Sequence, residues 1–373
     1  MQRETTTEGS NRKQASAWRA RACAALVLAA LIAPAGCGSE SPGDLMRYIP
    51  VEATTVVRLD AKRLRGTELD RRIQQFIKRN DFFRWKIEDL AKQTGVEVFR
   101  HIDTVILALP ASTDKGPEDF ALVVGGKFDR SRVVGWYKEY VKTAGAEPRE
   151  RAYGRHTIYY GKDEGYHVAF MSSRTLLVGT KAWIGKMLDL ADGKGAGVEK
   201  RQEMQALLAR VQSSRILSAV MYLSDAQRTA LAQAGAGDAS LASMTSLVGD
   251  LDSSRGVELA VVIDHTTPEA AKGVAESFAK TLKEIRGSAL VAKAGLSGVA
   301  EKLVGTAQGR EFRLTAELAP AQLDELVHGI QNFAQMQMAE QLKVPGAAGG
   351  RGGRAPFGPV QPLLPPAGGQ PQR

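Results

Sequence analysis

The sequence predicts an α+β protein: two similar units of mostly antiparallel sheet with helices on one face, followed by a disordered tail. β-Branched runs of strand length alternate with segments whose apolar residues recur at helical spacing. Several expected strands follow one another directly, which fits antiparallel pairing because a parallel crossover needs a long connection. Hydrophobic residues make up 43% of the 373 positions, enough for a core and too few for several membrane spans.

The first unit is expected to span residues 45–192. It opens with a β-branched strand, Thr54–Asp60. Apolar residues at helical spacing over 67–94 are interrupted at Asn80, which predicts two consecutive helices. Asp129 is placed to cap a later helix. The other expected elements are strands at 101–109, 119–128, 155–160, 166–171 and 175–180, and helices at 130–144 and 181–191.

The second unit, expected at residues 198–343, repeats the order strand, helix, two strands, helix. The glycine-rich stretch Asp192–Gly197 separates it from the first unit. Thr267 and Pro268 are placed to start its long helix. Residues 288–306 show no pattern that assigns an element. The expected elements are helices at 199–212, 224–234, 267–286 and from Pro320 onward, and strands at 216–223, 243–252, 256–264 and 310–318.

The net charge does not indicate a nucleic-acid partner. The whole chain carries +9, of which residues 1–36 and 344–373 contribute +3 each. The remaining +3 is spread over 37–343, where acidic and basic residues are interspersed. Such a mixed surface is typical of a solvated protein rather than a basic groove, so we expect no nucleic acid.

Residues 1–36 have the layout of an export signal. A polar and basic start is followed by the apolar run Ala22–Ala33, which is well short of the roughly 20 residues of a membrane-spanning helix. Small residues then lead to Cys37. We therefore expect a signal peptide at 1–36, cleavage between Gly36 and Cys37, and a polar tether at 37–44.

The segment Ala35-Gly36-Cys37 resembles the lipobox of bacterial lipoproteins, whose cysteine becomes the lipidated first residue; Pro34 stands where that pattern prefers leucine. Cys23 is lost with the signal, so a lipid on Cys37 would also remove the one thiol left in an oxidising compartment. With the repeated body, the chain resembles uncharacterised envelope lipoproteins. The resemblance implies a membrane anchor through Cys37 in the bacterial envelope, at the outer membrane facing the periplasm.

A second interpretation of the same segment stays open. Ala33-Pro34-Ala35 also fits the cleavage site of ordinary secretion, with the cut after Ala35. Cys37 would then be a free thiol in a soluble, exported protein.

The sequence contains no recognisable catalytic or metal-binding motif. No H-E-x-x-H, G-x-S-x-G or complete P-loop is present, so we expect no catalytic residue, metal or cofactor and leave enzyme activity open, with a non-enzyme favoured. His156 and His167 lie on neighbouring expected strands and either meet or are two separate histidines. The acidic pair Asp250 and Asp252 would matter only across a cleft.

One aromatic pair could form a surface patch. Phe82 and Trp85 are three residues apart on the second of the two consecutive helices and lie off its apolar stripe. They either form an exposed patch for a partner or are covered by the neighbouring unit.

Residues 344–373 have the composition of a disordered tail, since half of them are glycine or proline. Proline recurs every third residue within this tail, and large apolar residues recur with the same period. A polyproline II helix has three residues per turn, so each set forms one ridge that could dock into a partner's groove. A flexible tail without a partner is the other interpretation. The docking residues are Pro356, Phe357, Pro359, Val360, Pro362, Leu363 and Pro365.

These observations lead to a membrane-anchored envelope lipoprotein that acts as a binding or scaffolding module. Its expected partners are the membrane, through the lipid on Cys37, and an envelope protein or wall polymer. An exported hydrolase of unfamiliar type is one alternative. A solute-binding protein is another, although the direct strand links do not fit two parallel-sheet lobes.

Overall fold

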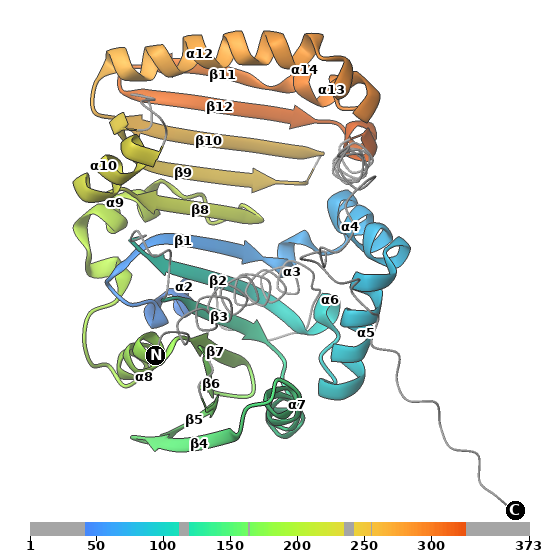
Figure 1. The fold of residues 1–373 in the computed structure, drawn as a ribbon, viewed down its shortest axis with the longest axis vertical. Helices are drawn as coiled ribbons and strands as arrows, with labels where there is room; N and C mark the ends of the chain where they lie inside the picture. The colour runs from blue at the N-terminus through green and yellow to red at the C-terminus, as the bar shows by residue number, and fades with distance from the viewer. Residues whose placement is uncertain (1–41, 112–118, 163–164, 235–241, 255, 326–373) are drawn as a thin grey trace, which may run out of the picture. The chain divides into compact units, whose positions relative to one another are not determined.

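The computed structural model describes residues 42–111, 119–162, 165–234, 242–254 and 256–325. All of them lie in the first of two compact units, Met1–Gly329, and the second unit, Ile330–Arg373, falls outside the described residues. The α+β class with a large antiparallel sheet is confirmed (Figure 1).

Twelve strands form the sheet. In chain order they are β1 (Ala53–Asp60), β2 (Ile102–Pro110), β3 (Ala121–Gly126), β4 (Pro148–Tyr153), β5 (His156–Gly161), β6 (His167–Phe170), β7 (Thr175–Gly179), β8 (Leu217–Tyr222), β9 (Met244–Asp252), β10 (Val257–His265), β11 (Val304–Gln308) and β12 (Glu311–Leu318).

Helices and short 3-10 turns connect these strands. Within the described ranges they include α2 (Pro42–Leu45), η1 (Met46–Tyr48), α3 (Ala61–Leu64), α4 (Glu68–Arg79), α5 (Asp81–Thr94), α6 (Val98–His101), α7 (Arg130–Thr143), α8 (Lys181–Ala191), η2 (Val198–Lys200), α9 (Gln202–Arg210), α10 (Asp225–Ala234), α12 (Pro268–Gly287), α13 (Ala289–Ala294) and α14 (Ser297–Lys302).

All twelve strands belong to one sheet, in the order β11-β12-β10-β9-β8-β1-β2-β3-β7-β6-β5-β4. Strands from the two predicted units meet where β1 pairs with β8 antiparallel, Val57 lying opposite Ala219. Outward from this pair, β8-β9-β10 mirrors β1-β2-β3, and a helix follows both β3 and β10. The unit boundaries and the duplication stay predictions.

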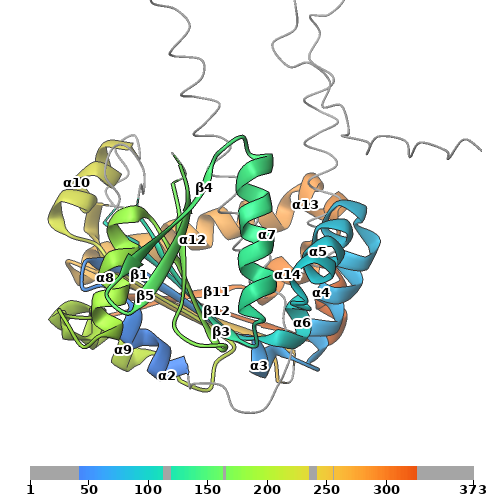
Figure 2. The ribbon, with the colours of Figure 1, turned by 90° about the horizontal axis from the view of Figure 1, so that it is seen from below.

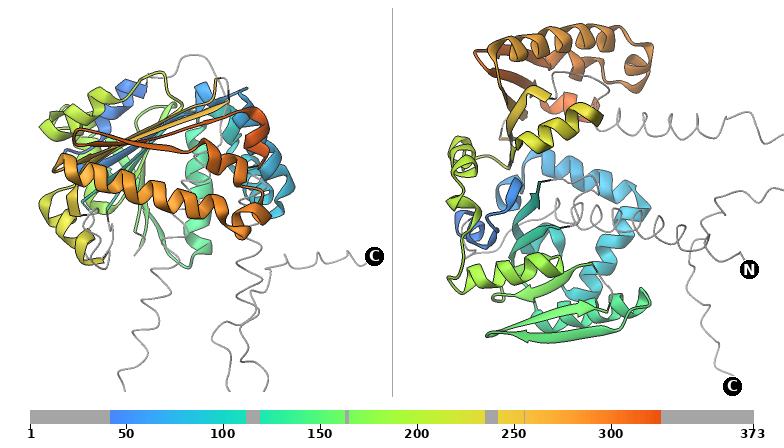
Figure 3. Two further views of the ribbon diagram at one scale, coloured as in Figure 1. Left: turned by 90° about the horizontal axis from the view of Figure 1, so that it is seen from above. Right: turned by 60° about the vertical axis from the view of Figure 1, so that its left-hand side comes forward.

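The front face of the sheet, toward the viewer in Figure 1, holds one core. Leu59, Val105 and Leu122 point from β1, β2 and β3 into a cluster with residues of α4, α5 and α7. At the other end of the sheet α12 packs along β11 and β12, with the rings of Phe278 and Phe312 at 5.7 Å (Figure 3).

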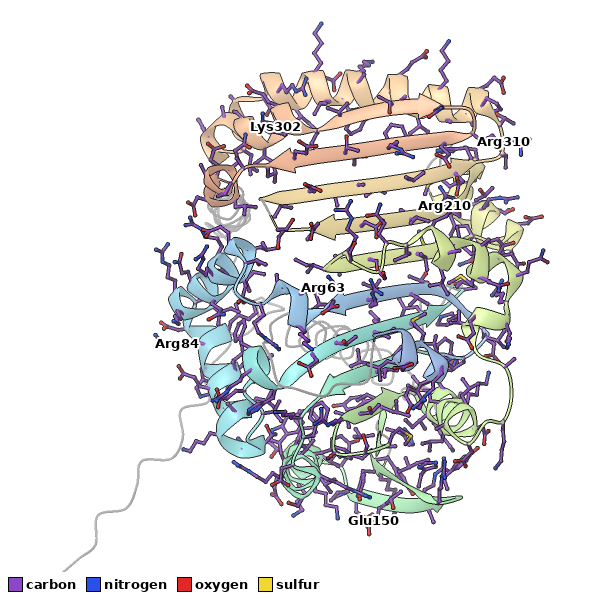
Figure 4. The ribbon with its side chains drawn as sticks, turned by 180° about the vertical axis from the view of Figure 1, so that it is seen from behind. Arg63, Arg84, Glu150, Arg210, Lys302 and Arg310 are labelled. Carbon is purple, nitrogen blue, oxygen red and sulfur yellow. The ribbon has the colours of Figure 1, made fainter. Side chains whose placement is uncertain are left out.

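The back face, toward the viewer in Figure 4, is covered by helices along one part of the sheet and carries charged side chains along the other. Val56, Ile106 and Val123 pack there against residues of α2, α8 and α9. Within the described ranges no helix lies in front of β9, β10 and β12 in this view, and their back-face positions include Asp250, Asp264 and several other charged residues.

The expectation of helices on one face is therefore wrong for the strands of the first unit. Figure 2 shows α7 and α12 on one side of the sheet and α2 and α9 on the other. The physical reason is that β2 and β3 are buried on both faces, as their nearly continuous apolar sequences allow.

Capping side chains set several helix starts as the sequence predicts. Asn80 separates α4 from α5 and accepts a hydrogen bond from the Phe83 amide at 3.3 Å. Asp129 accepts from the Arg132 amide at 3.2 Å. Thr180 stands at the start of α8, but its hydroxyl donates to Asp119 at 2.5 Å instead of capping the helix.

Candidate functional site

The back face contains a hollow where the helical cover of the sheet gives way to the open strands. Its volume is about 300 Å³, at the lower end of the size range of small-molecule sites. Apolar side chains from the sheet, η1, α9 and the following loop form most of its wall. The lining residues are Met46, Val56, Arg58, Glu199, Leu208, Val211, Ser213, Ser218 and Val220.

Strand pairing sets two polar lining residues of the hollow, Arg58 and Ser218, in one row with Asp250, which lies beyond the lining. Arg58 of β1 lies directly opposite Ser218 of β8, and Ser218 lies opposite Asp250 of β9. Directly opposed residues share a face, so these three side chains form one row across three strands. The adjacent row on the same face is Val56, Val220 and Val248, which places an apolar strip beside the polar one.

Arg58 is the cation of this row. Burial lowers the pKa of its guanidinium, whereas the carboxylates of Asp60 and Asp250 oppose that effect, so the group keeps its charge. Its Nη2 atom is 3.4 Å from the backbone oxygen of Gln212, and its Nε atom is buried with no hydrogen-bond partner among the described residues. The guanidinium thus has hydrogen-bonding capacity that the described protein atoms do not use.

Asp250 is the acidic member of the row. Burial raises the pKa of its carboxyl, and the positive charges of Arg215 and Arg58 oppose this rise. Its Oδ1 atom is buried without a hydrogen-bond partner within the described ranges. The predicted acidic pair Asp250 and Asp252 does share the back face, and Asp252 forms an ion pair with Arg215 at 3.8 Å. The two carboxylates therefore do not face each other across a cleft.

Two arginines hold the wall of the hollow against the sheet. Arg210, at the end of α9, contacts Asp264 at 2.6 Å and Glu311 at 3.0 Å (Figure 4). Arg215, in the loop before β8, contacts Glu258 at 3.1 Å. Because these ion pairs anchor both ends of the segment 210–215, Val211 and Ser213 are held over the floor.

A half-buried cation beside an apolar strip suits a small ligand with an apolar part and an anionic group. Partial burial strengthens a charge-assisted hydrogen bond relative to bulk water, and the apolar wall can contact the apolar part of the ligand. Within the described residues no three side chains of histidine, cysteine, aspartate or glutamate gather closely enough to hold a metal ion.

The two predicted histidines do not meet. His167 lies opposite Tyr160 and stacks on its ring at 5.1 Å. His156 is four residues before Tyr160 on the same strand, about 13 Å away at the rise of a β-strand. Its Nε2 atom lies 2.9 Å from Asp192 at the end of α8, a hydrogen-bonded contact between a hairpin and a helix.

The other predicted site residues lie outside the described residues. These are Gly36 and Cys37 at the cleavage and lipidation site, and the tail residues Pro356, Phe357, Pro359, Val360, Pro362, Leu363 and Pro365. Sequence reasoning did not find the row of Arg58, Ser218 and Asp250. The available signal was a lone arginine inside the β-branched run of β1.

Comparisons with known proteins find likeness only to solved structures, at low sequence identity. No family model and no curated protein matches the chain. Among solved structures, crystal form I of TP0453 is similar, with a TM-score of 0.44 and 9% identity, covering 78% of this chain and 97% of that one. Crystal form III of TP0453 has a TM-score of 0.42 and 10% identity, covering 76% and 98%.

No residue of the hollow is assigned from these structures. None of the helices in the described part of the chain combines the length and apolarity that a membrane crossing needs.

Proposed function

We propose that the protein is an exported, lipid-anchored binding module of the bacterial envelope, held in the outer membrane through Cys37 and facing the periplasm. Its back-face hollow binds a small molecule that has an apolar part and a carboxylate or phosphate group. The observation that carries the binding role is Arg58, a half-buried cation whose buried Nε donor has no partner among the described residues, at the floor of an apolar-walled hollow. The anchor is supported by the signal-like segment that ends at Cys37.

Dansylglycine tests the hollow because it joins a fluorescent apolar ring system to one carboxylate. Its methyl ester has the same ring system without the charge. For Arg58→Leu we expect the affinity for dansylglycine to fall by about tenfold or more, since a charge-assisted hydrogen bond is lost. The affinity for the methyl ester should stay within about twofold, because the apolar wall is unchanged. Arg58→Lys should retain part of the difference between the two probes.

Arg313→Leu is the matched control, because Arg313 lies on the same back face in β12 and does not line the hollow. It should bind both probes as the wild type does. Equal loss of both probes in Arg58→Leu would indicate a folding defect, which circular dichroism would detect. Unchanged dansylglycine binding in a folded Arg58→Leu would refute the hollow as an anion site.

The hydrolase alternative gains no support from the geometry, since His156 and His167 are separated along the sheet. A protein or wall polymer as an additional envelope partner remains part of the proposal, with the proline-rich tail as its docking segment.

A further inference from the structure

The junction of α4 and α5 forms a corner whose two sides differ sharply. On the inner side the rings of Phe76 and Phe83 lie 5.9 Å apart and pack against the front core with the buried Ile77. On the outer side Trp85 is 57% exposed, the most exposed of the large hydrophobic side chains among the described residues. The expectation that a neighbouring unit covers this residue is therefore wrong for Trp85.

Four exposed basic residues lie within seven positions of this tryptophan in the sequence. We call them, together with Trp85, the α4–α5 corner: Lys78, Arg79, Arg84, Trp85 and Lys86. Within 78–86 the acid is Asp81, which pairs with Arg84 at 2.6 Å, and Glu88 and Asp89 follow on the next turn of α5. Figure 4 shows Arg84 at the outer margin of the described unit.

Two cations of the corner, Lys78 and Arg79, are exposed beside the Lys86–Trp85 contact. The Nζ atom of Lys86 lies 4.6 Å from the centre of the Trp85 ring, so cation and ring are presented together. Neither Lys78 nor Arg79 has a carboxylate within ion-pair distance among the described residues. Both side chains are exposed, near the end of α4.

This combination matches an anionic bilayer surface better than a protein partner. Tryptophan is favoured at the level of lipid headgroups because its ring is apolar and its N–H is polar. Clustered lysines and arginines are attracted to anionic lipids, and each one adds to the attraction near the surface. A protein interface of ordinary size instead needs a larger apolar centre than the single ring of Trp85 provides.

We propose that the α4–α5 corner docks on an anionic lipid surface, with Trp85 at headgroup level. This contact does not depend on the lipid at Cys37. Where the anchor is present, the corner is a second point of attachment, and two points restrict how the body can turn above the bilayer.

Quenching of tryptophan fluorescence by brominated lipids tests the proposal with the protein as cells produce it, lipidated or not. Vesicles of brominated phosphatidylcholine are compared with vesicles that also contain about one third phosphatidylglycerol. We expect quenching to rise when the anionic lipid is present. The increase should be lost in Trp85→Phe, which separates Trp85 from the other tryptophans.

Charge reversal distinguishes the corner from a general effect of protein charge. The variant Lys78→Glu/Arg79→Glu/Lys86→Glu should quench no more in anionic than in neutral vesicles. Its matched control reverses Lys272, Lys280 and Lys283, three exposed lysines of α12, and should behave as the wild type.

Several results would overturn the proposal. They are quenching that is independent of anionic lipid, an unchanged signal in Trp85→Phe or in the corner variant, and an equal loss in the α12 control. Failure of dansylglycine binding or of lipidation at Cys37 would leave these outcomes unaffected, so the two proposals are tested separately.

Discussion

At the scale of single residues, His167 makes the stability of the fold depend on pH in the acid range. Its side chain is buried, and its Nδ1 atom has no hydrogen-bond partner within the described part of the chain. Burial, with Arg151 and Lys181 nearby, lowers its pKa from 6.5 to about 4. Between these two values the unfolded chain binds a proton that the fold does not, so the contribution of His167 to stability falls as the pH falls through this window.

His167→Phe should remove this contribution while keeping an aromatic ring against Tyr160. We expect the free energy of unfolding to drop less between pH 7 and pH 4 in this variant than in the wild type, by up to about 3 kcal/mol. Urea unfolding followed by circular dichroism at both pH values measures the two drops. The difference between pH values, rather than stability at pH 7, carries the test, because the substitution also changes packing. Equal drops would contradict it.

The residues of the hollow show why a site can escape sequence reasoning. Arg58 is visible as one cation in a β-branched run, and its position on the back face follows from strand alternation. Ser218 and Asp250 lie in its row because of the register between strands that are far apart in the sequence. No local pattern encodes that register, so the row could not be assembled before the sheet was known.

At the scale of elements, those with a strong periodic signal were predicted well. The helix expected at 181–191 is α8 with the same bounds, and the break at Asn80 separates α4 from α5. Elements that were not predicted include β4, β11, α13 and α14. These are short, and β4 and β11 are edge strands with mostly exposed residues, so neither has an alternating apolar face that sequence could reveal.

The proline-rich tail is a separate element outside the described residues and stays a prediction. If its two ridges dock on an envelope partner, deletion of 356–365 should remove at least one neighbour that crosslinks to the full chain in cells. A control deletion of 346–355, which is glycine-rich and contains no proline, should retain that neighbour. Retention of every crosslinked neighbour after the first deletion would exclude docking.

At the scale of the whole molecule, the first question is where the chain is held. Growth with a radioactive fatty acid should label the wild type and leave Cys37→Ala unlabelled, because the thiol is the expected acceptor. Membrane fractionation should show the wild type in the outer-membrane fraction. An unlabelled, soluble wild type would instead favour cleavage after Ala35 and a freely diffusing protein.

The fold class of the whole molecule was predicted correctly, but the presence of helices on both faces of the sheet was not. Direct strand links correctly implied antiparallel pairing, and every strand pair in the described sheet is antiparallel. The nearly continuous apolar sequences of β2 and β3 indicate strands that are buried on both faces, but they were interpreted only as strands. The two predicted units join into one sheet through the β1–β8 pair. This long-range contact cannot be predicted from the sequence of either unit alone.

That central pair also sets an order of events during synthesis. The ribosome produces β1 long before β8, because Val57 precedes its partner Ala219 by a long stretch of sequence. Until then one side of β1 has unpaired backbone groups, and the growing sheet has a temporary open edge at its future centre. Closing it requires a contact of high sequence separation, which is slow to form. A chaperone that recognises extended strands would thus find its substrate at Ala53–Asp60 in the nascent chain, a segment that the finished fold conceals.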